Sequence, residues 1–185
     1  MARGTPTALA LGPGYLYTAP VNTAEPADLT TPWASVAAAW VALGYTDEGS
    51  EFRYSPDTDN VEVAEELDPV QVVTTGRSSS VRFSMAELTA THLKLAMNGG
   101  NITVGAGIVT FEPPDLGSET RVAIGFQSED GTERWVYRQC FQTGDVSIVR
   151  RKGADKAVID TEFSLEKPSS GAKLYKAVFS SSVRA

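Results

Sequence analysis

The acidic side chains of the chain are concentrated in one stretch, where closely spaced carboxylates could bind a cation. Residues 45–68, YTDEGSEFRYSPDTDNVEVAEELD, hold nine of the 23 acidic residues and one base, so they carry a charge of −8 within a total of −7. A calcium loop that started at Asp57 would need glycine at its sixth position and a bidentate glutamate at its twelfth. Glu62 and Asp68 stand there instead. The EF-hand pattern fails, and an irregular cation site stays open as an alternative.

Catalytic chemistry has few candidates in this sequence. The same carboxylates could include a glycosidase pair, but no spacing marks which two would share a cleft. The only histidine, His92, lies within a predicted helix and has no accompanying GxSxG motif, which argues against nucleophilic catalysis. One histidine and one cysteine, Cys140, cannot form a metal site of several such ligands, and no phosphate-binding glycine motif is present. The sequence therefore predicts neither an enzyme nor a cofactor.

Length and composition predict one soluble domain made in a reducing compartment. The 185 residues are enough for a hydrophobic core, and a single cysteine excludes an internal disulfide. The first 20 residues form a poor signal peptide because glycine and proline interrupt their apolar run, and no run reaches the roughly 18 residues of a membrane-spanning helix. A net charge of −7 also disfavours binding to nucleic-acid phosphates.

Alternation with a period of two dominates the chain from Val70 onward. The predicted strands are VQVVTT, SVRFSM, TRVAIGFQ, ERWVYRQCFQ, DVSIVRR, KAVIDTEFSL and AKLYKAVFS. A helix is predicted over 85–97, because Ser84 and Glu87 fit a capping box and Asn98 and two glycines supply a left-handed stop. These elements predict a mainly β fold, a β-sandwich or barrel of two packed antiparallel sheets with one flanking α-helix.

The remaining residues are predicted to form an arm and a hairpin. Residues 1–31 are rich in Pro, Gly, Thr and Ala and indicate an extended arm, so residues 32–185 would form the single β-domain. Within that domain residues 47–68 predict a long hairpin with SEFRYS and VEVAEEL as strands and PDTDN as the turn. Such a ribbon, with one apolar and one acidic face, is only marginally stable alone in water.

Two interpretations of the acidic hairpin stay open: a solvated charged loop, or an arm that contacts other subunits. In the second, carboxylates meet basic residues of a neighbouring copy, and "RRK", residues 150–152, is the basic counterpart. The residues expected at such contacts are Glu51, Phe52, Arg53, Tyr54, Asp57, Asp59, Val61, Glu62, Val63, Glu65, Glu66, Asp68, Arg150, Arg151 and Lys152.

Four stretches, taken in order, carry a family resemblance over most of the chain. They are GYLYTAPVNTAEP, WVALGYTDEGSEFRYSPDTDNVEVAEELDPV, SSSVRFSMAELTATHLKLAMNGG and WVYRQCFQTGDVSIVRRKGADKAVIDTEFSLEKP. In this order they resemble the tail tube proteins, or major tail proteins, of long non-contractile-tailed bacteriophages, particularly those of actinobacterial hosts. The resemblance implies a fold shared with the tubes of contractile tails and of type VI secretion.

The resemblance also implies a structural role. Six copies would close into a ring, and rings would stack into a hollow tube that conducts DNA from capsid to host without specific binding. The implied partners are further copies, a tape-measure protein, a tail terminator and tail-tip or baseplate proteins, with no membrane involved. The protein would belong to the virion tail and be assembled in the host bacterial cytoplasm. Asp160 and Glu162 are candidate lumen-facing acids, although a solvated outer face is equally open.

Two other classes of function stay open beside the tube subunit. A neck or tail-terminator protein would share the fold and would also form rings. A carbohydrate- or surface-binding β-sandwich module could use Trp33, Trp40 and Trp135 as platforms, although the alternation around Trp135 favours packing.

Overall fold

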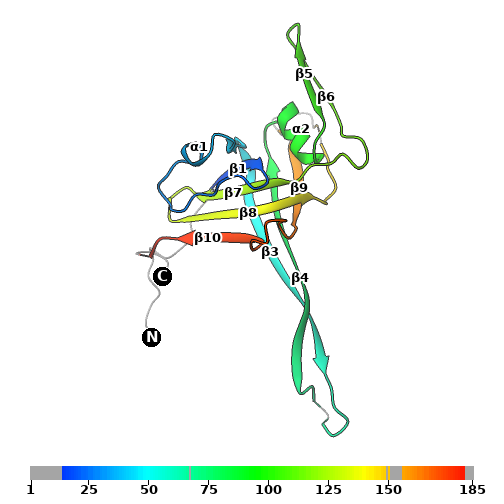
Figure 1. Ribbon diagram of the computed structural model, residues 1–185. Coiled ribbons are helices and arrows are strands. Elements are labelled where there is room, and N and C mark those ends of the chain that lie inside the picture. The colour runs from blue at the N-terminus through cyan, green and yellow to red at the C-terminus, as the bar shows by residue number, and fades with distance from the viewer. Residues whose placement is uncertain (1–13, 67, 149, 151–155, 182–185) are drawn as a thin grey trace.

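The protein is described by a computed structural model that covers residues 14–66, 68–148, 150 and 156–181 (Figure 1). Its strands pair antiparallel throughout, which confirms the predicted mainly β fold class. The elements are β1 (Gly14–Pro20), α1 (Trp33–Val36), β2 (Val41–Ala42), β3 (Thr46–Val61), β4 (Gln71–Met85), α2 (Ala90–Ala96), β5 (Asn101–Gly105), β6 (Ile108–Glu112), β7 (Val122–Ser128), β8 (Glu133–Gln142), β9 (Ile159–Leu165) and β10 (Tyr175–Phe179).

Two antiparallel sheets are present. The larger has the strand order β2-β1-β7-β8-β9-β4-β3, with β10 paired to β8, and the smaller is the hairpin β5–β6. The larger sheet doubles back on itself, because Phe52 of β3 packs on rings of β8 and β10. Its ring centroid lies 5.4 Å from that of Trp135, 5.5 Å from that of Tyr137 and 5.0 Å from that of Tyr175. Both packed layers therefore belong to one continuous sheet.

The core lies between these layers and is built by alternation. In β9, Ile159, Thr161 and Phe163 are buried, whereas Asp160 and Glu162 are half-buried on the opposite face. The main cluster of buried side chains is Leu16, Leu43, Val81, Phe83, Met85, Leu95, Ala96, Ile124, Tyr137, Cys140, Ile159 and Phe163.

The prediction of an extended arm is wrong for residues 14–31. Residues 14–20 form β1, which pairs with β7 along its whole length, and residues 22–31 form a loop over β8. Arg134 of β8 fastens this loop: its guanidinium donates to the carbonyl oxygens of Asp28 and Thr31, both at 2.9 Å. The composition of the segment obscured a strand whose Leu16 is buried. Residues 1–13 lie outside the described residues.

The helix is shorter than the predicted 85–97. Ser84 does not cap it, because Ser84 still lies in β4 and donates to the carboxylate of Asp160. Glu87 instead accepts from the backbone N–H of Tyr45 at 3.1 Å, and the N-cap is Thr89, whose hydroxyl accepts from His92 N at 3.2 Å. Pairing between strands therefore outcompetes the local capping pattern.

The hairpin also differs from the prediction. β3 runs without a turn to Val61, so PDTDN lies inside a strand and the true turn spans residues 62–70. β3 is an edge strand, where the missing N–H of Pro56 is tolerated. The register shifts after Asp57, where Thr75 of β4 is the extra residue of a bulge, and the turn-forming residues of β3 stay paired. Of the predicted strands VEVAEEL and DVSIVRR, residues 62–66 and 145–148 do not form strands, and Ile148 makes an isolated bridge to Ile159.

Candidate assembly surfaces

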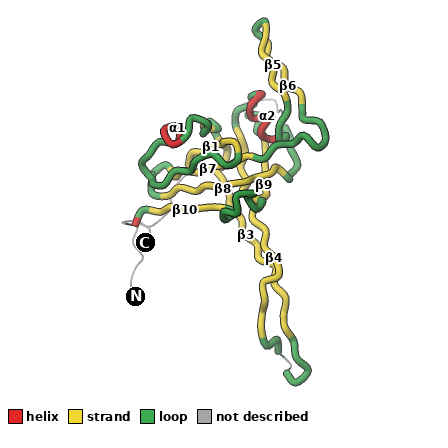
Figure 2. The backbone as a smooth tube through the Cα atoms, viewed as in Figure 1, coloured by secondary structure: helices red, strands yellow, loops and turns green. Residues whose placement is uncertain are grey.

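Two hairpins project from the body in opposite directions (Figures 1 and 2). The longer is the outer part of β3–β4 with its turn, residues 54–79, here called the arm. The shorter is β5–β6, here called the upper hairpin. Each is only two strands wide beyond the body, and no other layer of the described residues covers it. Such ribbons are marginal alone in water and gain stability from a covering surface.

The arm combines exposed valines with exposed acids. Its outer strand residues are exposed on both faces. The exposed valines are Val61, Val63, Val70, Val72 and Val73, which are 40% to 61% exposed. The exposed acids of the turn are Glu62, Glu65, Glu66 and Asp68. The tip therefore offers apolar contact area together with negative charge.

The acids of the arm's strands share one face. Residues opposite each other in an antiparallel pair lie on the same side, and here Asp57 faces Gly76 and Asp59 faces Val73. A Cβ at position 76 would lie 2.9 Å from Oδ2 of Asp57, so the exposed carboxylate would have to shift slightly. Val61 lies on the same face as these acids, opposite Gln71.

The predicted contact residues nearest the body have other partners. Phe52 is a half-buried part of the aromatic cluster with Trp135 and not a free contact residue. Arg53 pairs with Glu51 at 3.3 Å, and both are exposed, so the pair contributes little stability. Tyr54 is 47% exposed at the base of the arm and remains available for contact.

The predicted basic counterpart is described only in part. Arg150 is exposed, whereas Arg151 and Lys152 lie outside the described residues. A base that the sequence did not single out, Lys156, pairs with Asp47 of β3, with 2.7 Å between Nζ and Oδ1.

A polar sheet face contains Asp160 and Glu162. Asp160 lies opposite Ser84 and Glu162 opposite Arg82, so both acids have polar neighbours on β4. The members of this face on β3, β4 and β9, here called the polar face, are Glu51, Arg53, Ser80, Arg82, Ser84, Asp160, Glu162 and Ser164. It lies on the side of the sheet opposite the buried core.

The upper hairpin has one apolar face. Ile102 lies opposite Phe111 and Val104 opposite Val109, so all four share a side. Ile102 and Phe111 are half-buried near the body, whereas Val104 is 73% and Val109 56% exposed. Sequence reasoning missed this element, although the alternation on both sides of Gly-Ala-Gly was a signal for it. Its two-residue loop has positive φ at Ala106 (50°) and Gly107 (75°), as in a type I′ turn.

A groove lies between α2 and the β1–β2 edge of the sheet, with a volume of ≈670 Å³. Its exposed surface is mostly apolar and includes the small side chains of Ala19, Pro20, Ala39, Val41, Ala42 and Val122, while eight of the 18 lining residues are polar. Its charged lining residues, Lys94 and Arg121, are exposed. Arg121 donates to Glu166 at 3.1 Å, and hydrogen bonds from Arg121 and Gln139 lower the pKa of the Glu166 carboxyl.

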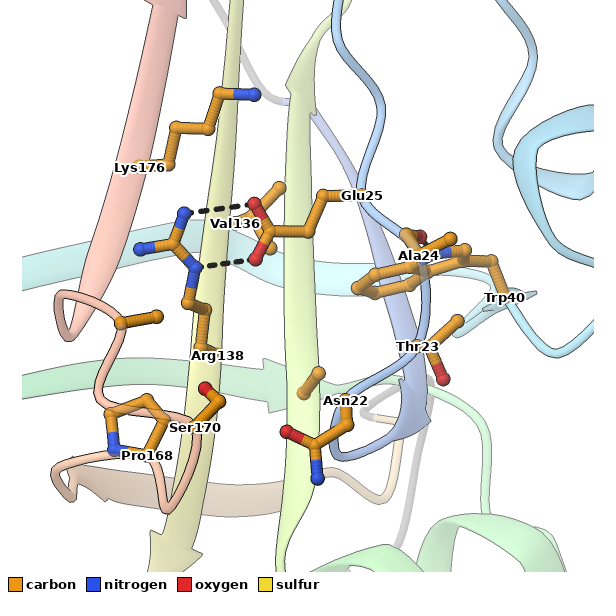
Figure 3. A pocket seen from close by; sticks show the side chains of 12 residues that line it. Asn22, Thr23, Ala24, Glu25, Trp40, Val136, Arg138, Pro168, Ser170 and Lys176 are labelled. Carbon is orange, nitrogen blue, oxygen red and sulfur yellow. Dashed lines mark hydrogen bonds and ion pairs between the residues drawn. The ribbon is translucent and has the colours of Figure 1, made fainter.

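A second pocket, of ≈470 Å³, is organised by an ion pair (Figure 3). Arg138 of β8 donates to both carboxylate oxygens of Glu25, and this contact raises the pKa of the guanidinium. Arg138 also donates to the carbonyl oxygen of Lys173 at 2.8 Å, and Lys176 donates to that of Pro26 at 3.2 Å. These polar groups fasten loops to β8 and do not form a nucleophile–base arrangement.

The described residues offer little support for a sugar-binding or metal-binding site. Trp33 is 3% and Trp40 4% exposed, so the prediction that they could form sugar platforms is wrong; Trp135 packs in the aromatic cluster. His92 is buried in α2, with its Nδ1 2.6 Å from the carbonyl oxygen of Glu87. Within the described ranges, no three His, Cys, Asp or Glu side chains gather as metal ligands do, and no helix there has the length and hydropathy to span a membrane.

Comparisons with known proteins point to one family. A family model described as "Phage tail tube protein" matches residues 1–160. No curated protein matches the chain. Among solved structures, a chain in the cryo-EM structure of the anti-feeding prophage baseplate, 6-fold symmetrised, is similar at 10% identity with a TM-score of 0.49. The similarity covers 96% of this chain and 98% of that one.

Proposed function

The chain belongs to the phage tail tube protein family, and on that premise we propose that it is the subunit of a hollow, non-contractile phage tail tube. Members of this family are structural proteins of the virion tail. In the proposed assembly six copies form a ring, rings stack, and DNA passes through the bore from capsid to host. An actinobacterial phage with a long non-contractile tail is the proposed source, in keeping with the sequence resemblance.

The observation that carries the proposal is the arm. Within the described part of the chain, residues 55–61 and 71–78 pair only with each other, and the valines at the tip are exposed to solvent beside four acids. A monomer gains no stability from such an exposed ribbon, whereas a neighbouring copy would bury its valines and neutralise its acids. The arm is therefore proposed to make the contact between successive rings.

The polar face is proposed to line the bore. Asp160 and Glu162 would then repel DNA phosphates and keep DNA from binding as it slides. Further proposed partners are a tape-measure protein, a tail terminator and tail-tip or baseplate proteins, with assembly in the bacterial cytoplasm.

Shortening the arm tests its role in stacking. Tyr54 lies opposite Ser79, so an Asn-Gly turn that replaces residues 55–78 keeps the register and leaves Phe52 in the core. Because the removed residues are mostly exposed, the melting temperature should stay within a few degrees of that of the wild type while tube formation is lost. Circular dichroism and electron microscopy measure the two effects.

A matched variant separates charge from shape. It keeps the arm and converts the six acids between residues 57 and 68 to their amides. If those acids fix the register, this variant should form fewer or misaligned tubes, although its arm is complete. Full-length tubes from the shortened variant would contradict the proposed role of the arm.

The second candidate is a neck or tail-terminator ring protein. Its assembly would stop at a ring, whereas a tube subunit would continue to stack. Ring-only particles at every concentration, with no stacking, would favour this candidate over the tube subunit.

A further inference from the structure

The upper hairpin is an amphipathic ribbon with an incompletely covered apolar face. Val104 and Val109 lie opposite each other and continue the stripe begun by Ile102 and Phe111. The inner pair is half-buried near the body, whereas the outer pair is more than half exposed. The opposite face carries Asn101, Thr103, Thr110 and Glu112, with Ile108, which is 65% exposed, at its tip. The outer apolar pair therefore requires a cover that the described part of this chain does not supply.

We propose that this apolar face docks into the groove between α2 and the β1–β2 edge of a neighbouring copy. The inference rests on the proposed function only in taking a second copy of this chain as the partner. It concerns surfaces other than the arm and assigns them to a contact between copies lying side by side.

The chemistry of the groove matches that of the hairpin. No charged residue occurs from residue 101 to residue 111, and most of the surface that the groove exposes is apolar. Its ≈670 Å³ compares with roughly 30 Å³ for one water molecule in the liquid, so several aliphatic side chains fit. Burying them there leaves no charge unpaired in an apolar site.

The charges around the two surfaces are opposite in sign. Asp115, which is exposed, follows the hairpin, whereas Glu112, also exposed, ends β6 on the face of Thr103 and Thr110. Lys94 and Arg121 line the groove and are exposed. Docking would bring Asp115 of one copy toward the bases of the other, which favours one orientation of the hairpin.

The positions of the two surfaces favour a side-by-side contact. The upper hairpin rises beside α2 (Figure 1), and α2 is one wall of the groove. The upper hairpin and the groove therefore both lie toward the end of the molecule that is opposite the arm. A contact between different patches of equivalent copies is heterologous, and it generates a ring when the rotation closes.

Cross-linking between two differently tagged variants tests the contact. One carries Val104→Cys and the other Val41→Cys, at an exposed position that lines the groove. The native Cys140 should stay silent, because it is buried and burial raises the pKa of its thiol. Under conditions where the wild type assembles, a short thiol cross-linker should join the two tags. Thr103→Cys, on the polar face, is the matched control and should give at least about fivefold less product.

A charge insertion provides the second measurement. The double variant Val104→Asp/Val109→Asp should raise the concentration needed for assembly by about 100-fold, whereas Thr103→Asp/Thr110→Asp should leave it within about threefold. Both pairs are on an exposed ribbon, so equal melting curves by circular dichroism would show that folding is intact.

The outcomes separate this inference from the proposed function. Rings or tubes of the apolar-face variant at wild-type concentrations would overturn the inference and leave the proposed function standing. Homodimers from Val104→Cys alone, without a mixed product, would mean that two hairpins pair with each other and would also overturn it. A wild type that never assembles would contradict both.

Discussion

One arginine fastens to the sheet a loop whose sequence has no clear strand or helix periodicity. Arg134 is 1% exposed and donates to the carbonyl oxygens of Asp28, Leu29 and Thr31, and its guanidinium lies 5.0 Å from the ring centroid of Trp33. A buried cation is stable only when such acceptors surround it. The same loop is ordered by the Asp28 carboxylate, which accepts from the backbone N–H groups of Thr30 and Thr31; these hydrogen bonds lower its pKa well below the usual range.

Replacing this arginine should destabilise the fold without changing the assembly surfaces. Arg134→Met keeps much of the side-chain volume but leaves three carbonyl oxygens without their donor, so the free energy of unfolding should fall by about 3 kcal/mol. Urea denaturation followed by tryptophan fluorescence measures the change.

An exposed arginine provides the control. Arg53→Met, on the polar face, loses only an exposed ion pair and should change the free energy of unfolding by less than about 1 kcal/mol. Equal losses for the two variants would show that the contacts of Arg134 do not stabilise the loop.

At the scale of elements, α2 starts later in the chain than the sequence predicts. α2 begins after Thr89 and not at the capping box predicted from Ser84 and Glu87. Thr89→Ala should therefore lower the free energy of unfolding by about 1 kcal/mol through loss of the N-cap. Thr91→Ala, at an exposed position of the same helix, should be neutral or slightly stabilising, since alanine favours helix. Thermal unfolding of the two variants measures the difference. A Thr89→Ala variant with unchanged stability would contradict the assignment of Thr89 as the N-cap.

The strands of the body were predictable because burial on one face produces a visible alternation. β9 is the clearest example: the sequence places Ile159 and Phe163 on one face and Asp160 and Glu162 on the other, as the structure has them. The acidic hairpin was found as an element, but its turn was misplaced. PDTDN favours a turn locally, whereas the pairing of β3 with residues 71–85 is set by contacts distant in sequence.

Two other features were hidden from local reasoning. β1 lies in a Pro- and Gly-rich segment, and its partner β7 is about 100 residues away, so only the folded sheet reveals it. The groove combines residues from β1, β2, α2 and β7, and no sequence pattern joins them. The acids of the arm were predictable as a charged surface, but which copy or ring they meet remains a prediction.

At the scale of the whole molecule, the chain has a compact body with a projection at each of two opposite ends (Figure 2). The arm and the upper hairpin both expose valines that a monomer leaves in water. A shape of this kind suits a repeating assembly, because each projection can be covered by the body of another copy. The proposed function and the hairpin inference assign these projections to different contacts, one between rings and one within a ring.

The most direct test of the proposed function is electron microscopy of the purified wild-type protein over a concentration series. Hollow tubes, or rings that stack as the concentration rises, are the predicted result, with six subunits in end-on averages. Particles that remain monomers at the highest concentration, even with tail-tip proteins added, would contradict the assignment as a tube subunit.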